Sequence, residues 1–258
     1  LSFNGKTYDL EYKLFREISP RTAKHFLWLA ENGYYDGLCV HDYDMNDKKM
    51  YTGAYSVATG EDETDDGIAY KSYYEEIKKF KNYAEYPASV WSDEGRNTPT
   101  YTVYGEFSAN KFTVENGALK QEFGSLTMYY HDKDTEDRIY AKYLGGEHKG
   151  ETVAREYKYN SATSQFFISL ATTTGSSTKY CTFAKLSDDD SKEELQELME
   201  DIKTYAEDNY GEDGESEFVT SRSVQTDEDD PIVGKGKDVK FDIPNKPIII
   251  KKVSVKKY

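Results

Sequence analysis

The chain has 258 residues, of which 37% are hydrophobic, 31% are charged and 15% are aromatic. Its formal net charge of −15 makes nucleic acids and anionic membranes poor partners, because both repel an acidic surface. With 24 Tyr and 12 Phe the chain can still build a core, so the composition indicates a globular protein with acidic loops rather than a disordered acidic chain.

In the first half of the chain, hydrophobic periodicity predicts three strands and two helices. A helix near residues 20–32 has Ser19 as its N-cap, Pro20 at its first position and Gly33 at its end. The other expected elements of this half are a strand at 6–15, a short buried strand at 38–41, an acidic loop at 59–69, a helix within 70–86 stopped by Pro87, and a strand at 98–107.

The second half predicts strands followed by one long helix. This helix, near residues 191–208, is expected to begin with Ser191 as its cap and Glu194 three residues later. The order of elements indicates a mainly β barrel or sheet with helices at its ends. The other expected segments are strands at 124–130, 164–171, 179–186 and 246–255, a polar stretch at 131–157, a turn at 172–178 and an acidic mobile loop at 211–238.

Neither a metal nor a cofactor is predicted. Cys39 and Cys181 lie in strand-like stretches outside any C-x-x-C pair, and with only four His no zinc signature exists. Two buried free thiols are expected, and a disulfide stays open until the strands are placed. No run of about 18 apolar residues predicts a membrane-spanning helix. Because the chain starts at Leu1 and not at Met, we expect an upstream segment, which could include a signal peptide.

Several stretches, in the same order along the chain, resemble the cyclophilin family of peptidyl-prolyl isomerases. LEYKLFREISPRTAKHFLWLAENGYYDG, at residues 10–37, is similar to the family's opening strand and helix, and SQFFISLA, at 164–171, matches its S-Q-F-F-I stretch. GEF at 105–107, GSLTMYY at 124–130, KYCTFAKL at 179–186 and KPIIIKKVSV at 246–255 resemble further segments of the family.

The resemblance covers Lys6 to Val255 and implies a cyclophilin-like closed eight-stranded antiparallel β-barrel with two capping helices. An added helix within 70–85 is then expected outside the barrel. We expect a single domain over residues 1–258, with insertions near 56–100, 131–159 and 209–238.

The resemblance also implies an isomerase site with one essential replacement. The family's F-H-R-V motif falls on VHDY, where His41 is kept and Asp42 stands in place of the catalytic Arg. That Arg donates hydrogen bonds toward the prolyl nitrogen and eases rotation over a barrier of about 20 kcal/mol. A carboxylate only accepts hydrogen bonds and opposes this role electrostatically. Strand alternation points His41 to the face opposite Asp42.

The implied peptide-binding pocket is altered as well. F-M-x-Q-G-G resembles KMYTGA at 49–54, in which Lys49 replaces the pocket Phe and Thr52 replaces the Gln. Lys49 could supply a cation in place of the Arg, and the family's ligand-facing Trp has no equivalent. Two tyrosines replace small or polar groups and either fill the groove or offer a stacking surface. The expected pocket residues are Met50, Met128, Tyr129, Tyr130, Gln165, Phe167 as its floor and Tyr180.

The same stretch has a second interpretation, because Asp42, Asp44 and Asn46 resemble the start of a calcium loop. However, Asp47 stands where such a loop needs Gly, Gly53 stands where it needs Glu, and a strand precedes it. We therefore interpret the stretch as a remodelled catalytic strand and loop, with Asp44 and Asp47 as solvated loop charge.

Three functions remain open at this stage: an active isomerase or folding helper, a pseudo-enzyme that binds a proline-containing peptide or protein segment, and an interaction protein that uses only the fold. A hydrolase is disfavoured, because no nucleophile–base pair is recognisable. We expect weak or no isomerase activity. The compartment is expected to be extracytoplasmic, as for a trimmed bacterial lipoprotein, with the cytoplasm as the alternative.

Overall fold

A computed structural model describes residues 1–58, 67–112, 118–130, 137–145, 147–173, 178–212, 214–225 and 238–256. Over these ranges the protein is mainly β, with three α-helices: α1 (Pro20–Glu31), α2 (Tyr73–Lys78) and α3 (Asp189–Tyr210). In the described part of the chain, none of the helices has the length and apolar character that crossing a membrane requires.

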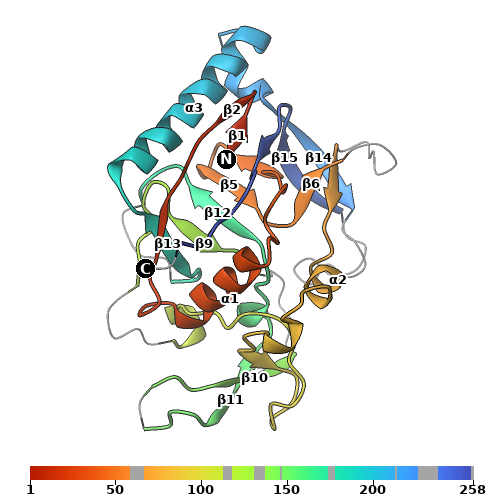
Figure 1. Cartoon of the computed structure of the whole chain (residues 1–258), viewed down its shortest axis with the longest axis vertical. Coiled ribbons are helices and arrows are strands. Elements are labelled where there is room, and N and C mark those ends of the chain that lie inside the picture. Colours follow the sequence, from red (N-terminus) through yellow and green to blue (C-terminus); the bar gives the residue numbers. More distant parts are fainter. Residues whose placement is uncertain are drawn as a thin grey trace.

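A six-stranded antiparallel sheet forms the centre of the molecule (Figure 1). Its strand order brings residues from both ends of the sequence side by side, so the segments that resemble the cyclophilin motifs become neighbours. In spatial order the strands are β3 (Tyr12–Leu14), β13 (Thr182–Leu186), β9 (Leu126–Met128), β12 (Phe166–Ser169), β5 (Lys49–Thr52) and β4 (Asp42–Asp44).

The remaining strands form four small antiparallel sheets. Among the described residues the strands do not pair into one closed sheet of eight, so the eight-stranded closure stays a prediction. The small sheets are β16 (Ile248–Ile249)–β1 (Ser2–Phe3)–β2 (Lys6–Thr7), β11 (Thr152–Glu156)–β10 (Arg138–Lys142)–β8 (Val90–Trp91), β14 (Val219–Gln225)–β15 (Asp238–Pro244), and β6 (Tyr55–Val57)–β7 (Ile68–Tyr70).

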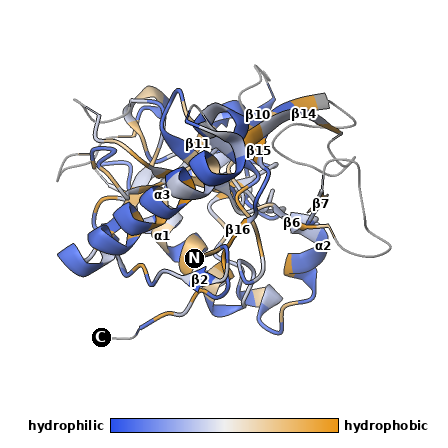
Figure 2. Ribbon diagram, turned by 90° about the horizontal axis from the view of Figure 1, so that it is seen from above, coloured by the Kyte–Doolittle hydropathy of each residue, from blue (hydrophilic) through white to orange (hydrophobic). Residues whose placement is uncertain are grey.

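One face of the six-stranded sheet carries the main core. Phe166 is buried there, and its ring centroid lies 5.5 Å from that of Phe26 on α1 and 5.5 Å from that of Tyr35. The long helix α3 adds an apolar stripe spaced three and four residues apart, which is typical of an amphipathic helix, and the rest of its surface is hydrophilic (Figure 2). The buried residues of this stripe are Leu195, Leu198, Ile202 and Ala206.

Helix α1 begins at Pro20, as predicted, but its N-terminal amides are capped from a distant segment. The buried carboxylate of Glu106 accepts hydrogen bonds from Arg21 N at 3.1 Å, Thr22 N at 2.9 Å and Thr22 Oγ1 at 2.8 Å. The predicted cap, Ser19, instead donates its hydroxyl to Phe15 O at 3.1 Å. The GEF stretch therefore anchors the first turn of α1 to the body of the protein.

Helix α3 begins slightly earlier than predicted, at Asp189, because Asp188 caps it by accepting a hydrogen bond from Ser191 N at 2.8 Å. Ser191 itself lies in the first turn, where its Oγ accepts a hydrogen bond from Glu11 N at 2.9 Å. The capping box expected at Ser191 and Glu194 is therefore wrong, and Asp188 takes the role of the cap.

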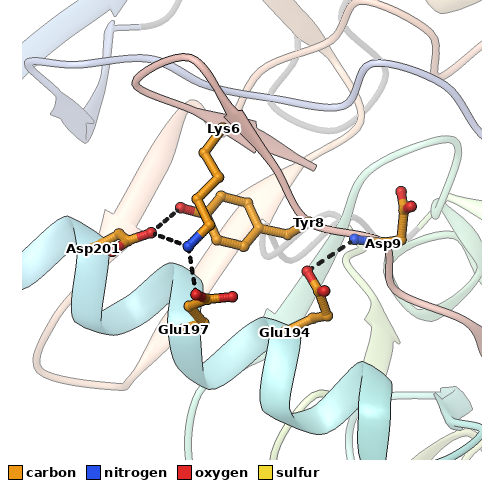
Figure 3. Close-up of polar contacts among 6 residues, drawn as sticks. All are labelled: Lys6, Tyr8, Asp9, Glu194, Glu197 and Asp201. Carbon is orange, nitrogen blue, oxygen red and sulfur yellow. Dashed lines mark hydrogen bonds and ion pairs between the residues drawn. The ribbon is translucent and has the colours of Figure 1, made fainter.

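The N-terminal segment is fastened along α3 (Figure 3). The Lys6 ammonium lies 2.9 Å from Asp201 Oδ2 and 2.5 Å from Glu197 Oε1, and the Tyr8 hydroxyl donates to Asp201 at 2.5 Å. The backbone N–H of Asp9 donates to Glu194 at 3.3 Å. These contacts hold the start of the chain against the acidic surface of the helix.

Several segments differ from the predicted elements. Residues 98–107 form only isolated bridges, between Pro99 and Trp91 of β8 and between Val103 and Ala162. The helix expected within 70–86 shortens to α2 and a 3₁₀ turn at Tyr83–Glu85, and α2 packs on α1 through Tyr73, whose ring lies 6.2 Å from that of His25.

Three segments form strands where loops were expected. The hairpin β10–β11 lies within the expected polar stretch 131–157, β14 lies within the expected acidic loop 211–238 and pairs with β15, which begins at the end of that loop, and β7 overlaps the end of the loop 59–69. On β10 the buried Ile139 and Ala141 stand between exposed charged residues, which conceal the strand pattern. Residues 59–66, 131–136, 174–177 and 226–237 of the expected loops and turns lie outside the described residues.

Cys39 and Cys181 are both buried and free, which confirms the predicted pair of free thiols. Burial raises the pKa of the Cys39 thiol to about 12. The Cys181 sulfur lies 3.4 Å from Thr22 Oγ1, beneath α1. Both cysteines therefore behave as small core residues.

Candidate functional site

The register of the sheet sorts the predicted site residues onto two faces. Cross-strand partners share a face, and Phe167 on β12 is paired with Tyr51 on β5 and Thr127 on β9. Asp42 on β4 is in turn paired with Tyr51. The face that carries these side chains, called the outer face from here on, lies opposite the main core, which contains Phe166.

The predicted pocket floor is present on the outer face but is covered. Phe167 is only 1% exposed. Its ring centroid lies 5.3 Å from that of Tyr51 and 5.9 Å from that of Tyr180, and the Lys49 ammonium lies 5.1 Å from the ring centroid. Tyr129 continues this aromatic surface, with its ring 5.6 Å from that of Tyr51. A proline ring therefore finds the face of Phe167 already occupied by other side chains.

The two predicted pocket methionines lie on the core face instead. Met50 is paired with Ile168 and Met128 with Phe166, and all four side chains are buried in the main core. Alternation along β5 and β9 explains this placement, since Met50 and Met128 each point away from the outer-face side chains Lys49, Tyr51 and Thr127.

Tyr130 and Gln165 lie at the margin of the outer face. Tyr130 is buried, with ring centroids 5.5 Å from Phe107 and 5.1 Å from Tyr180. Gln165 is also buried, and its backbone carbonyl accepts a hydrogen bond from Tyr129 N at 3.0 Å. Tyr130 therefore supports Tyr180 from below and fills space beside the predicted groove.

Asp42, at the position of the family's Arg, is half-buried at the edge of the outer face. Its carboxylate accepts a hydrogen bond from Asp242 N at 3.0 Å, so the added hairpin β14–β15 covers this edge of the sheet. Burial raises the pKa of Asp42 to about 6, and the nearby carboxylates of Asp242 and Asp44 add to the rise. This edge of the outer face therefore carries acidic groups.

His41 points away from Asp42, as strand alternation predicts. Its buried ring lies 4.8 Å from Tyr55 and 5.0 Å from Phe241, in a second core cluster beneath β15. Burial lowers the pKa of His41 to about 3, and its Nδ1 atom has no hydrogen-bond partner among the residues that the structure describes. The His41 imidazole is therefore a buried, neutral core group and does not reach the outer face.

The turn between β4 and β5 is closed by its own acidic side chains. Asp44 Oδ1 accepts hydrogen bonds from Asn46 N at 2.9 Å and from Asp47 N at 2.8 Å, while Asp47 pairs with the Lys49 ammonium at 3.0 Å. Asp44 is therefore a turn residue and not free loop charge. Within the described ranges, no three His, Cys, Asp or Glu side chains are grouped so as to hold a metal ion.

Two further motif residues have structural roles. Thr52, in place of the family's Gln, is buried and donates its hydroxyl to Cys39 O at 2.8 Å. Gly53 has φ +101°, and a Cβ atom there would lie 2.4 Å from Ser164 O, so the strand crossing admits only glycine. This close approach gives Gly53 a structural reason that does not depend on activity.

Tyr51 and Asp242 belong to the outer face, although they were not among the predicted site residues. Tyr51 could have been predicted, because residues two apart on a strand lie on the same face and Lys49 was already expected near the pocket. Asp242 gave none, because its hairpin lies far away in the sequence. A separate cavity of about 280 Å³ opens between the β4–β5 turn and α3, and Tyr43, Met45, Leu170, Met199, Ile202 and Phe218 form most of its wall.

The antiparallel sheet, the helix capped by Glu106 and the S-Q-F-F strand define a cyclophilin-like scaffold with a changed outer face. The sequence model of the family described as "Cyclophilin type peptidyl-prolyl cis-trans isomerase/CLD" matches residues 2–222. The chain belongs to this family, which confirms the resemblance found in the sequence.

Two staphylococcal relatives, both named putative peptidyl-prolyl cis-trans isomerase, match part of the chain. The Staphylococcus haemolyticus protein is 44% identical over 52 residues, covering 20% of this chain and 25% of that protein. The Staphylococcus epidermidis protein is 33% identical over 90 residues, covering 35% of this chain and 43% of that protein. The matches thus span less than half the length of these relatives.

Solved cyclophilins are similar at low identity. A Cryptosporidium parvum cyclophilin type isomerase, crystallised in the presence of the dipeptide Ala-Pro, is 16% identical with a TM-score of 0.43, covering 97% of this chain and 94% of that one. A Hirschia baltica cyclophilin is 13% identical with a TM-score of 0.33, covering 70% of this chain and 60% of that one.

Proposed function

We propose that this protein is a cyclophilin-family binding module that recognises an extended protein segment on its outer face and has little or no prolyl isomerase activity. The observation that carries the proposal is Asp42, a carboxylate at the position where the family's mechanism needs Arg. The cover over Phe167 supports the same conclusion, because the ring that would receive the proline is 1% exposed.

The chemistry of the replacement is unfavourable at neutral pH. The twisted prolyl nitrogen gains a lone pair as its amide resonance is lost, and a hydrogen-bond donor stabilises that state. Removing one such donor typically costs roughly 100- to 1000-fold in rate. With a pKa near 6, Asp42 is mostly ionised at pH 7, so it repels the developing lone pair as well as failing to donate.

The binding role draws on what the outer face retains. Tyr51, Tyr129 and Tyr180 are half-buried, so each offers part of its ring to a ligand. Rings of this kind contribute large contact areas at low cost in conformational entropy, which suits recognition of an extended chain with proline or other flat side chains. Assistance to folding by holding such a segment fits the same surface.

A second candidate is an active isomerase that uses Lys49 as its cation. Lys49 lies on the outer face, 5.1 Å from the Phe167 ring, and its side chain is 19% exposed. It is held by Asp47 at 3.0 Å, so it would have to leave this ion pair to reach a substrate. Because breaking this ion pair costs free energy, we rank an isomerase that uses Lys49 below the binding module.

A protease-coupled assay on a chromogenic Ala-Pro peptide separates the two candidates. We expect turnover near the uncatalysed rate for the wild type, unchanged in Lys49→Ala, and at most a partial gain in Asp42→Arg. Robust wild-type turnover that disappears in Lys49→Ala would overturn the proposal and make Lys49 the catalytic cation. Lys48→Ala, in the same turn, is the matched control for the loss of one positive charge.

A further inference from the structure

The outer face combines aromatic rings with carboxylates that lack a cation. Asp42 and Asp44 both lie on β4, and the register pairs them with Tyr51 and Lys49 of the neighbouring strand. Burial raises the pKa of Tyr51, and the hydroxyls of Tyr129 and Tyr180 and the carboxylates of Asp42 and Asp44 add to the rise.

The negative charge at this edge is only partly compensated. In the described part of the chain, Asp42 accepts a hydrogen bond from Asp242 N but forms no ion pair with Lys or Arg, and its charged neighbours are the carboxylates of Asp242 and Asp44. The nearest cation on the face, Lys49, is already paired with Asp47 at 3.0 Å. When a cationic group approaches a half-buried carboxylate that has no ion-pair partner, it stabilises the ionised form of that carboxylate.

The protein's own lysine shows which group the rings accept. The Lys49 ammonium lies 5.1 Å from the centroid of the Phe167 ring, within the distance over which a cation is attracted to an aromatic face. Tyr51 carries the aromatic surface to Asp42, its partner across the β4–β5 pair, and Tyr129 adds a second ring 5.6 Å from that of Tyr51. A second cation placed on the Tyr51 ring would have an aromatic face on one side and the Asp42 carboxylate at its edge.

We propose that the outer face binds an arginine side chain of an extended, basic protein segment, which deepens the proposed function and rests on it. Arginine fits better than lysine, because its planar guanidinium stacks on a ring and offers a row of N–H donors to a carboxylate. The replacement of the family's Arg by Asp42 therefore reverses the preference of the site, from a neutral prolyl group to a cationic one. The net charge of −15 favours the approach of the same partner.

The test is fluorescence anisotropy of labelled, otherwise identical peptides whose central residue is arginine, citrulline, lysine or proline. Citrulline keeps the shape of arginine without its charge. We expect the arginine peptide to bind about tenfold more tightly than the citrulline and proline peptides, with weakening at high salt. Equal binding of the arginine and citrulline peptides, or tighter binding of the proline peptide, would overturn the inference.

Matched variants locate the effect on this face. Asp42→Asn and Glu193→Gln each remove one negative charge, but Glu193 is exposed on α3. We expect Asp42→Asn to lower the affinity for the arginine peptide about three- to tenfold and Glu193→Gln to leave that affinity unchanged. Tyr129→Leu, which removes a half-buried ring, is expected to lower the affinity for the arginine peptide by a similar factor. Equal losses in Asp42→Asn and Glu193→Gln would contradict a defined site and indicate attraction by net charge alone.

The result is distinguishable from a failure of the proposed function. Robust isomerase turnover would overturn the proposed function whatever the peptides show. Without turnover, a peptide series with no preference for arginine would overturn this inference and leave the binding module standing.

Discussion

The two faces of the six-stranded sheet follow the cyclophilin pattern to very different extents. On the core face, Phe166 packs against α1 and forms the interior expected from the S-Q-F-F stretch. On the outer face, Phe167 is also present, but it is surrounded by Tyr51, Tyr180 and Lys49, and Asp42 stands across β5 from it, paired with Tyr51. Core residues are retained because packing requires them whatever the activity, whereas the residues of a site change with its chemistry.

The largest expected effect is on stability, and it is measured by removing the rings of Phe166 and Phe167 one at a time. Phe166→Ala should lower the free energy of unfolding by about 5 kcal/mol, because its cavity is enclosed by α1 and the sheet. Phe167→Ala should cost about 3 kcal/mol, because the half-buried Tyr51 and Lys49 can collapse into the space. Urea unfolding followed by circular dichroism measures both values. Equal losses would mean that the outer face is packed as firmly as the core.

The next effect tests the anchor that links the core face to α1. Glu106→Gln replaces a carboxylate that accepts hydrogen bonds from Arg21 N, Thr22 N and Thr22 Oγ1, and it turns one acceptor into a donor facing donors. We expect a loss of about 2 kcal/mol in urea unfolding. Glu17→Gln, at an exposed position before the same helix, should change stability by less than about 0.5 kcal/mol. Similar values for the two variants would rule out Glu106 as the cap.

A smaller, pH-dependent effect tests the outer face. Burial raises the pKa of Asp42 to about 6, so the folded state binds its proton more tightly than the unfolded state. Ionised Asp42 therefore destabilises the fold above pH 6, and this cost is relieved as the pH falls through 6 toward 4. We expect Asp42→Asn to be more stable than the wild type by about 1 to 2 kcal/mol at pH 7.5.

The measurement is the difference in unfolding free energy between the two proteins across this pH range. Both proteins keep His25 and His41, so histidine titration cancels in the difference. The gap should close by about pH 4. A gap that widens as the pH falls would show that Asp42 is stabilised as a carboxylate, for example by an undetected cation.

The sequence was a good guide to the parts of the fold that packing determines. Long periodic segments predicted α1 and α3, and the S-Q-F-F stretch predicted the core ring Phe166 and the placement of Phe167 on the opposite face. The caps were less predictable, because Glu106 reaches α1 from a segment far away in the sequence. The strand β14 was mistaken for part of a loop, since the acidic and glycine-rich sequence around it conceals the strand pattern.

For the site, the sequence indicated the chemistry better than the geometry. The motif predicts Asp42 in place of the family's Arg and offers Lys49 as an alternative cation, and both stay predictions. The placement of Met50 and Met128 on the core face needed the strand register, which one sequence does not give. The contact between Asp42 and Asp242 needed the position of an added hairpin.

The central claim is that the outer face has lost the catalysis of its family. Proton exchange spectroscopy on an Ala-Pro peptide measures the interconversion of its cis and trans forms directly, without a protease, and shift changes in the same sample report binding. We predict no exchange above that of the free peptide on adding the wild-type protein. Exchange peaks that appear at a small fraction of one equivalent of protein would contradict the account.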